Sequence, residues 1–353
     1  MQPQDRLTIL SYIVCALVIG ALFGLLLRGV QSTLLANQSP KPYQPSTPQS
    51  SAPTARLQHP LTIQALSNRS YGEGLVSIER QLADRATSTV QIISYPSDSY
   101  KINALMLTPK QPQPVGGYPV VILAHGFLPG EQYKTEAEEY LGWADVLTNA
   151  GFMVVKPDYR GHDQSWGAQE SAYYSAGYVH DVLNLAASMQ KYHQVNPKKI
   201  GALGHSLGGQ VVLKAAISQP NLISAIGLAA SSGGTATEIY NIGFPSENYG
   251  GISSSARESL YRVYGTPTED SPFWRSTSPL YALDRLSGGV WVAHCSDDQN
   301  VPKWLSDQLA DKAKAAGKST TYFQCESGGH GFGGAAIEPF NASLREFFTT
   351  QLK

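Results

Sequence analysis

The residues best suited to chemistry lie in the segment Gly204–Gly208, which reads Gly-His-Ser-Leu-Gly. The apolar run Lys199–Leu203 precedes it and a helix-favouring stretch follows, so the pattern predicts a strand, a tight turn and a helix around Ser206. Glycines on both sides of the serine let the strand and the helix approach each other, and such a turn strains the serine backbone and exposes its hydroxyl. The chemistry expected of Ser206 is nucleophilic attack on a carbonyl carbon. The alternative is a helix start that Ser206 merely caps.

A nucleophilic serine needs a base, and α/β-hydrolases, which carry this motif, run serine, acid, histidine along the chain. Two histidines lie downstream of Ser206, namely His294 and His330. His294 ends an apolar run that reads as a strand, whereas His330 lies in a glycine-rich loop after the strand Thr320–Cys325. We therefore predict that His330 is the base.

Two adjacent aspartates are candidates for the acid. Asp297 and Asp298 follow directly on the strand that ends near His294, and Val301-Pro302 comes shortly after them. We predict that Asp298 is the acid and keep Asp297 as the alternative. A catalytic triad uses one aspartate, so the other is expected to cap the helix that begins near Pro302.

The two donors of an oxyanion hole are also predicted. The continuous apolar run Tyr118–Ala124 reads as a buried strand, and His125-Gly126-Phe127 follows at its end. In this kind of site, backbone amides after the nucleophile and after the third strand hold the oxyanion, which here means Leu207 and Phe127. The two histidines beside these turns, His125 and His205, are expected only to shape them.

From about Leu61 to the C-terminus, the chain resembles the catalytic domain of the prolyl oligopeptidase (S9) group of α/β-hydrolases. The segments that carry the resemblance are, in order, His125-Gly126, Lys156–His162, Val195–Gly201, Gly204–Gly208, Ser278–Tyr281, Asp298–Pro302 and Gly329–Gly331. The resemblance supports Ser206, Asp298 and His330 as the triad and favours a serine peptidase. Two residues depart from the pattern: Asp163 and Cys295 stand where the group usually has glycine.

Apolar runs and helical patterns alternate along the rest of the chain. The runs Thr89–Tyr95 and Lys101–Leu107 predict a hairpin at an edge of the sheet. Further strands are predicted at Tyr118–Ala124, Phe152–Lys156, Ile200–Leu203, Ala225–Ala229, Val290–His294 and Thr320–Gln324. Helices are predicted near Glu136–Asn149, Ser175–Tyr192, Leu207–Ser218, Trp304–Ala316 and Glu338–Gln351. This alternation predicts an α/β fold, with a mostly parallel sheet, helices on both faces and an active site at the carboxyl ends of the strands.

A long insertion, about residues 231–288, separates two of the predicted strands. It contains eight aromatic residues: Tyr240, Phe244, Tyr249, Tyr261, Tyr264, Phe273, Trp274 and Tyr281. Connections of this length are usually functional. We expect a cap over Ser206 whose aromatic side chains line an apolar acyl pocket, with a satellite core inside the cap as the alternative.

The first sixty residues have a different composition. Leu7–Leu27 carries no charge and is just long enough to cross a bilayer as a helix, so residues 1–30 are predicted to be an uncleaved transmembrane anchor. A removed signal peptide is the alternative. Residues 31–60, rich in Pro, Ser and Gln, then read as a mobile linker, and residues 61–353 as the hydrolase domain.

The anchor suggests where the domain resides. A single N-terminal span most simply leaves the C-terminal domain on the extracytoplasmic side, although the flanking charges are nearly balanced. Cys15 lies in the span, which leaves Cys295 and Cys325 as a pair in the domain. Both are predicted near the carboxyl ends of neighbouring parallel strands, so a disulfide between them is expected to brace the loops of Asp298 and His330. Inert buried cysteines are the alternative.

Composition excludes other classes of function. The net charge is −1, which provides no basic surface for nucleic acid. The sequence holds no nucleotide-binding glycine loop and no Cys or His pair with metal-ligand spacing, so no cofactor and no metal are expected. The sequence thus predicts a serine hydrolase that acts on a peptide or other small-molecule substrate. Carboxylesterase activity is the alternative, and a catalytically silent, membrane-tethered binding protein is a more distant one.

Overall fold

The computed structural model describes residues 59–243 and 254–353. The predicted anchor and nearly all of the predicted linker lie outside these residues. Within the described ranges, no helix combines the length and the apolar character needed to cross a membrane.

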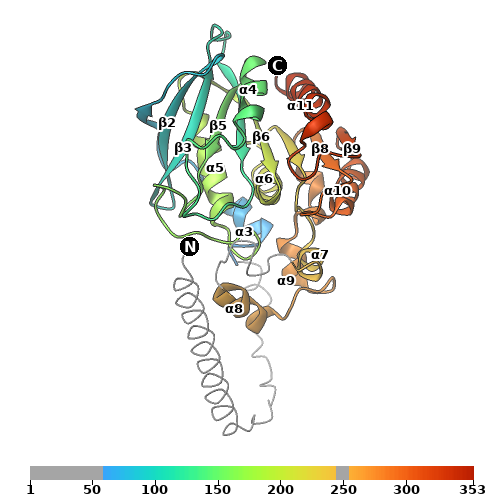
Figure 1. Cartoon of the computed structure of the whole chain (residues 1–353). Coiled ribbons are helices and arrows are strands. Elements are labelled where there is room, and N and C mark those ends of the chain that lie inside the picture. Colours follow the sequence, from blue (N-terminus) through green and yellow to red (C-terminus); the bar gives the residue numbers. More distant parts are fainter. Residues whose placement is uncertain (1–58, 244–253) are drawn as a thin grey trace, which may run out of the picture. The chain divides into compact units, whose positions relative to one another are not determined.

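The described residues form a nine-stranded sheet in the order β1-β2-β3-β5-β4-β6-β7-β8-β9 (Figure 1). The strands are β1 Ser77–Gln81, β2 Ser88–Ser97, β3 Tyr100–Pro109, β4 Tyr118–Ala124, β5 Met153–Pro157, β6 Val195–His205, β7 Ala225–Ala229, β8 Val290–Cys295 and β9 Thr320–Cys325. The pairs from β5 through β9 are parallel, whereas β1, β2, β3 and β5 pair antiparallel in succession. The predicted, mostly parallel sheet is confirmed.

The β2–β3 hairpin forms as predicted but is not at the edge of the sheet. Strand β1 covers β2 and takes the edge position. All five side chains of β1 are exposed, and its sequence Ser-Ile-Glu-Arg-Gln has no apolar alternation. The signal that identifies half-buried strands is therefore missing from β1.

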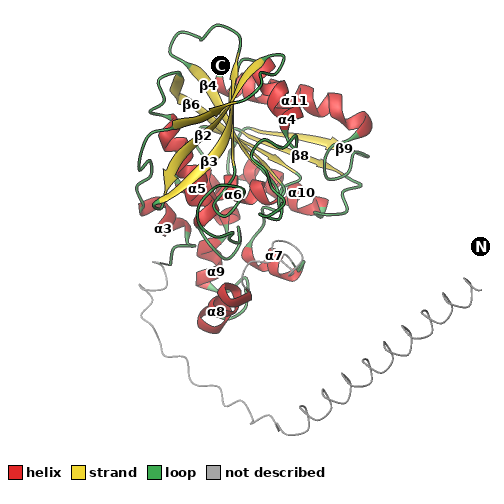
Figure 2. Ribbon diagram, turned by 60° about the vertical axis from the view of Figure 1, so that its left-hand side comes forward, coloured by secondary structure: helices red, strands yellow, loops and turns green. Residues whose placement is uncertain are grey.

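Helices cover both faces of the sheet (Figure 2). Leu123 and its neighbours pack under α4 and α11, whereas Ile122 and its neighbours pack under α3, α5, α6 and α10. Alternate residues of each strand point to opposite faces, so a strand that is buried on both sides reads as a continuous apolar run. These helices are α3 Ile63–Asn68, α4 Leu141–Asn149, α5 Gly177–Met189, α6 Leu207–Ser218, α10 Lys303–Ala315 and α11 Ile337–Leu352.

Helix α4 begins later than the sequence pattern predicts. Tyr140 precedes its first residue and has a left-handed backbone with a φ of 70°. This conformation ends any helical run that approaches it from the N-terminal side. Tyr140 thus belongs to the loop that crosses the carboxyl end of β4.

The described residues of the insertion between β7 and β8 form three short helices, α7 Ala236–Asn241, α8 Ser254–Tyr264 and α9 Pro272–Thr277. They lie together beyond one end of the sheet in both views (Figures 1 and 2). The insertion also includes single turns at Pro279–Tyr281 and Leu283–Arg285. Two of its predicted aromatic residues, Phe244 and Tyr249, lie outside the described residues.

Candidate active site

Ser206 lies in the turn between β6 and α6. Its φ of 53° and ψ of −120° put a non-glycine residue in a strained conformation. A Cβ atom at Gly204 would overlap the backbone of Gly208, and one at Gly208 would overlap the backbone of Ala124. The strand, the turn and the helix can therefore meet only with glycine at both positions, as the sequence pattern predicts.

His330 lies in the loop after β9, and its Nδ1 is 2.8 Å from Oδ2 of Asp298. Because the carboxylate can only accept, Nδ1 carries the proton and Nε2 is left with its lone pair. The His330 side chain is part-exposed and lines the same cavity as Ser206. Asp298 therefore orients a basic nitrogen for work in that cavity.

Asp298 is held by four groups. Its Oδ1 accepts from the amides of Asn300 at 2.8 Å and Val301 at 3.1 Å, and Oδ2 also lies 3.1 Å from Nε2 of His294. Burial of the side chain raises its pKa, but the hydrogen bonds from His294 and His330 outweigh burial and hold the pKa of Asp298 well below its usual range. Asp298 is therefore an ionised carboxylate that several hydrogen bonds hold in place.

Asp297 has different neighbours. Its carboxylate accepts from the amides of Gly328 and Gly329 at 3.1 and 2.8 Å, and these hydrogen bonds lower its pKa. The expectation that the second aspartate caps a helix is wrong, because Pro302 is the N-cap residue of α10 and Asp297 bonds to the loop of His330 instead. Asp297, the neighbour of Asp298, thus holds the loop that leads to His330.

His294, the other downstream histidine, is completely buried. Its Nδ1 lies 2.7 Å from the hydroxyl of Ser306, and its Nε2 lies 3.0 Å from the carbonyl of Val301. His294 does not line the cavity and contacts Asp298 from the buried side. This position agrees with the choice of His330 as the base.

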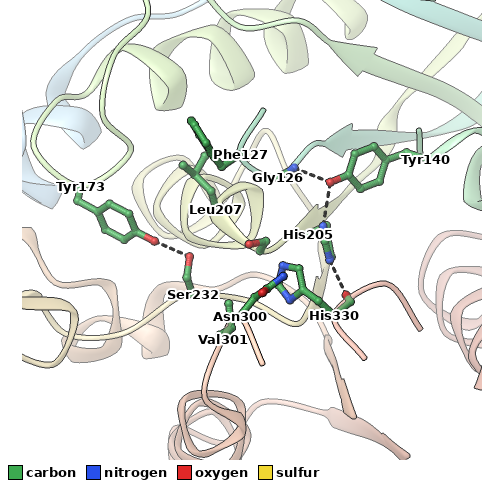
Figure 3. Close-up of a pocket in the computed structure, with 11 residues that line it drawn as sticks. Gly126, Phe127, Tyr140, Tyr173, His205, Leu207, Ser232, Asn300, Val301 and His330 are labelled. Carbon is green, nitrogen blue, oxygen red and sulfur yellow. Dashed lines mark hydrogen bonds between the residues drawn. The ribbon is translucent and has the colours of Figure 1, made fainter. Parts of the chain in front are cut away.

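The cavity in front of Ser206 has a volume of about 260 Å³ (Figure 3). The predicted oxyanion donors, Phe127 and Leu207, both line it. Leu207 is the first residue of α6, so its N–H has no acceptor within the helix. The other lining residues are Gly126, Tyr140, Tyr173, His205, Ser206, Ser232, Asn300, Val301 and His330.

The expectation that cap aromatics line this cavity is wrong for the described residues. The insertion contributes only Ser232 to the lining described here. Phe273 and Trp274 instead pack with Leu61, Tyr174 and other apolar residues in a separate cluster. These rings bury their apolar surface against one another, which is the satellite-core alternative.

A sequence model described as the prolyl oligopeptidase family matches residues 142–353. The chain belongs to this family. A curated Escherichia coli protein, described as an uncharacterized 31.7 kDa protein in the traX-finO intergenic region, is 30% identical over 112 residues. That alignment covers 32% of this chain and 37% of the relative.

Solved structures confirm the α/β-hydrolase fold of this prolyl oligopeptidase family member. Est1E from Butyrivibrio proteoclasticus with bound ferulic acid has a TM-score of 0.56 and 20% identity, over 73% of this chain and 98% of that one. The acetyl xylan esterase from Paenibacillus sp. R4 scores 0.58 at 16% identity, over 88% and 98%. Pyrococcus horikoshii acylaminoacyl peptidase scores 0.58 at 17% identity, over 76% and 42%. Family and fold together identify a serine hydrolase, an esterase or a peptidase.

Both departures from the family pattern are accommodated. Asp163 adopts a φ of 46°, the left-handed region in which glycine is the usual residue, and its carboxylate binds Lys134 and Thr135. Cys295 pairs with Cys325 across β8 and β9, and the structure joins them in a disulfide with Cα atoms 4.4 Å apart. The expected bridge is therefore present and ties the ends of the two strands that lead to Asp298 and His330.

His125, expected to be structural, contacts the loop that contains the predicted oxyanion donor Phe127. Its ring is buried, with Nδ1 2.7 Å from the carbonyl of Gly126 and Nε2 3.2 Å from that of Asp158. Burial lowers the pKa of His125 well below its ordinary value. The segment Lys156–His162 thus lies behind His125 and contacts it through the backbone carbonyl of Asp158.

Four cavity-lining residues were not identified from the sequence: Tyr140, Tyr173, Ser232 and Asn300. Tyr140 falls in a stretch whose pattern reads as helix, and Tyr173 lies on a connection without a motif. Asn300 lies within the segment Asp298–Pro302, where no feature of the sequence distinguishes it as a lining residue. No local pattern marks these side chains, because they meet only when the loops come together.

Proposed function

We propose that this serine hydrolase cleaves small acyl substrates, esters in preference to peptides, with Ser206 as nucleophile, His330 as base and Asp298 as acid. The observation that carries the triad assignment is the 2.8 Å contact that orients His330 from a buried, ionised Asp298, beside the strained serine in one cavity.

The proposed reaction begins when Nε2 of His330 removes the proton of the Ser206 hydroxyl as its oxygen attacks the substrate carbonyl. Asp298 stabilises the imidazolium that forms. The protonated ring then gives its proton to the leaving alcohol or amine, and an acyl-serine remains. A water molecule, deprotonated by His330, then attacks the acyl carbon. The bond between that carbon and Oγ of Ser206 breaks, His330 returns its proton to Oγ, and the carboxylic acid leaves.

The amides of Phe127 and Leu207 are proposed to donate to the oxyanion of each tetrahedral intermediate. Backbone donors that are fixed before the reaction are effective, because they need no reorganisation when the charge develops. The side chains at these two positions contribute only to the shape of the cavity.

The size of the cavity supports a small substrate. A volume of about 260 Å³ is slightly below the usual range of roughly 300–1,000 Å³ for small-molecule sites. The similarity to this chain covers 98% of Est1E and 98% of the acetyl xylan esterase, but only 42% of the acylaminoacyl peptidase. Both observations favour an ester of a small acid, and the family match keeps peptide hydrolysis as the second candidate.

A substrate panel tests the proposal. We expect purified protein to hydrolyse p-nitrophenyl esters of short acids faster than aminoacyl-nitroanilides, and to react with a fluorophosphonate probe at Ser206. Ser206→Ala and His330→Ala should remain folded and lose several orders of magnitude in rate. Near-normal turnover by Ser206→Ala would refute the triad, and faster cleavage of the anilides would make the enzyme a peptidase.

We further propose that residues 1–30 anchor the enzyme in a membrane and that residues 31–60 tether the domain on the extracytoplasmic side. The uncharged stretch Leu7–Leu27 supports the anchor. The Cys295–Cys325 disulfide supports the location, because disulfides persist in oxidising compartments.

A further inference from the structure

A chain of three hydrogen bonds links Gly126, Tyr140, His205 and His330, all of which line the cavity (Figure 3). The amide of Gly126 donates to the hydroxyl oxygen of Tyr140 at 2.9 Å. The same hydroxyl lies 2.8 Å from Nδ1 of His205, and Nε2 of His205 lies 2.8 Å from the backbone carbonyl of His330.

The direction of every bond in this chain is determined. A carbonyl can only accept, so Nε2 of His205 carries a hydrogen and donates a hydrogen bond to the backbone carbonyl of His330. Burial lowers the pKa of His205 to about 3, so the ring is neutral and Nδ1 has a free lone pair. The hydroxyl of Tyr140 must therefore donate to Nδ1, while its oxygen accepts from Gly126. Each group has the partner it requires.

Close packing holds the same groups together. A Cβ atom at Gly126 would lie 2.9 Å from the Tyr140 hydroxyl and 3.1 Å from Nδ1 of His205, so only glycine leaves room for the chain. The ring of Trp143 meets that of His205 edge-on at 5.4 Å, and the rings of His205 and His330 lie 4.5 Å apart.

The chain joins three segments that are far apart in sequence. Gly126 precedes the proposed oxyanion donor Phe127, His205 precedes Ser206, and the accepting carbonyl belongs to the base, His330. Beyond the triad, we propose that Tyr140 and His205 are positioning residues that set the oxyanion amide, the nucleophile and the base relative to one another. This inference rests on the proposed function.

The proposed role concerns rate more than substrate affinity. Displacing a reacting group by about 1 Å can cost on the order of 100-fold in rate. Tyr140→Phe keeps the ring that lines the cavity and removes only the hydroxyl that joins Gly126 to His205. We therefore expect kcat to fall by about 10- to 100-fold, with KM changed by less than about 3-fold.

The matched control is Tyr118→Phe. Tyr118 is also a buried tyrosine, at the other end of β4, and its hydroxyl donates to the carbonyl of Gln111 at 2.7 Å. The chemical change is the same, but it lies away from the catalytic loops. We expect Tyr118→Phe to keep kcat and KM within about 2-fold of the wild type, so that a general loss of packing is separated from a loss of alignment.

A double-variant cycle tests whether the two residues act as one unit. His205→Phe breaks both of its hydrogen bonds, so adding Tyr140→Phe should slow the enzyme little further. Gly126→Ala should resemble Tyr140→Phe, which provides a second route to the same answer if His205→Phe does not fold.

The rate of labelling by a fluorophosphonate probe separates this inference from the proposed function. Labelling of the wild type and not of Ser206→Ala supports the function, and slower labelling of Tyr140→Phe supports the inference. Equal labelling and kcat in folded Tyr140→Phe, an increase in KM alone, or additive effects in the cycle would overturn the positioning role and leave the function intact. Absence of labelling in the wild type would refute both.

Discussion

Asp297 and Asp298 are neighbours in sequence with opposite surroundings. The carboxylate of Asp298 is fully buried and contacts two histidines, whereas Asp297 is exposed and accepts from two glycine amides. At the scale of single residues, environment rather than residue type therefore assigns the roles.

Asp298→Asn is expected to lower kcat by about 10⁴-fold, because an amide that donates to His330 stabilises the wrong tautomer. Asp297→Asn retains a carbonyl oxygen that can accept from Gly328 or Gly329, so we expect a loss of less than about 10-fold. Steady-state kinetics on one ester measures both effects. A larger loss in Asp297→Asn would mean that Asp297 is the acid.

Lys214 on α6 is a second residue with a decisive environment. Its side chain is only 2% exposed, and no hydrogen bond or ion pair to it is found in the described parts of the chain. Burial lowers the pKa of Lys214 from the ordinary 10.5 to about 8. The ammonium form of Lys214 is therefore less stable in the folded protein than in the unfolded chain.

We expect Lys214→Met to raise the free energy of unfolding at pH 7 by up to about 3 kcal/mol. The lysine penalty is complete below the folded pKa of about 8, and the wild type recovers stability as the pH rises toward 10.5, because the unfolded chain then binds more protons than the folded one. Urea unfolding at pH 7 and pH 10.5 should show the difference shrinking. A variant less stable than the wild type at pH 7 would contradict this account.

At the scale of elements, the loops that follow β8 and β9 carry the proposed acid, Asp298, and the proposed base, His330. Their last residues, Cys295 and Cys325, are paired in register and joined by the disulfide. The Asp297 contacts with Gly328 and Gly329 tie the two loops together a second time. The separation between acid and base is thus determined by adjacent parallel strands and two cross-links.

Removing the bridge with Cys325→Ser should lower the free energy of unfolding by about 3 to 4 kcal/mol, as expected for a closed loop of this length. Activity at 25 °C should fall less than in triad variants, because the Asp297 contacts remain. Thermal unfolding with and without a reducing agent is the measurement. The agent should destabilise the wild type and leave Cys325→Ser unchanged; an equal response of both would argue against the bridge.

At the scale of the whole molecule, the described hydrolase domain contains the complete proposed machinery. All three triad residues and both oxyanion donors lie between Phe127 and His330. Residues 1–58 therefore contribute no group to the chemistry proposed here.

We expect a chain that starts at Pro60 to be soluble and to keep the kcat and KM of the full-length enzyme, whereas the full-length protein should sediment with membranes. Fractionation and ester hydrolysis measure the two properties. Full-length protein with an intact N-terminus in the soluble fraction would contradict the anchor, and inactive truncated protein would show that the first residues support the domain.

The amino-acid sequence alone predicts the order of the motifs along the chain, most strands and helices, and the five proposed catalytic groups. These features are local: a continuous apolar run marks a buried strand, and glycines around Ser206 mark a backbone that only a sharp turn requires. Two further signals are also local in the sequence. One is the spacing of Asp298 to Val301-Pro302, and the other is the position of His330 in a glycine-rich loop.

Which side chains meet in the cavity depends on how the folded chain brings distant segments together. Phe273 and Trp274 of the cap pack into a separate cluster, and Tyr140 and Tyr173 line the cavity instead. Strand β1 joins the sheet through backbone hydrogen bonds, and its exposed side chains show no apolar pattern that would predict this pairing. The physical reason is that apolar rings can be buried against several partners at similar gain, and a hydrogen bond such as Tyr140 to His205 exists only after distant loops are brought together.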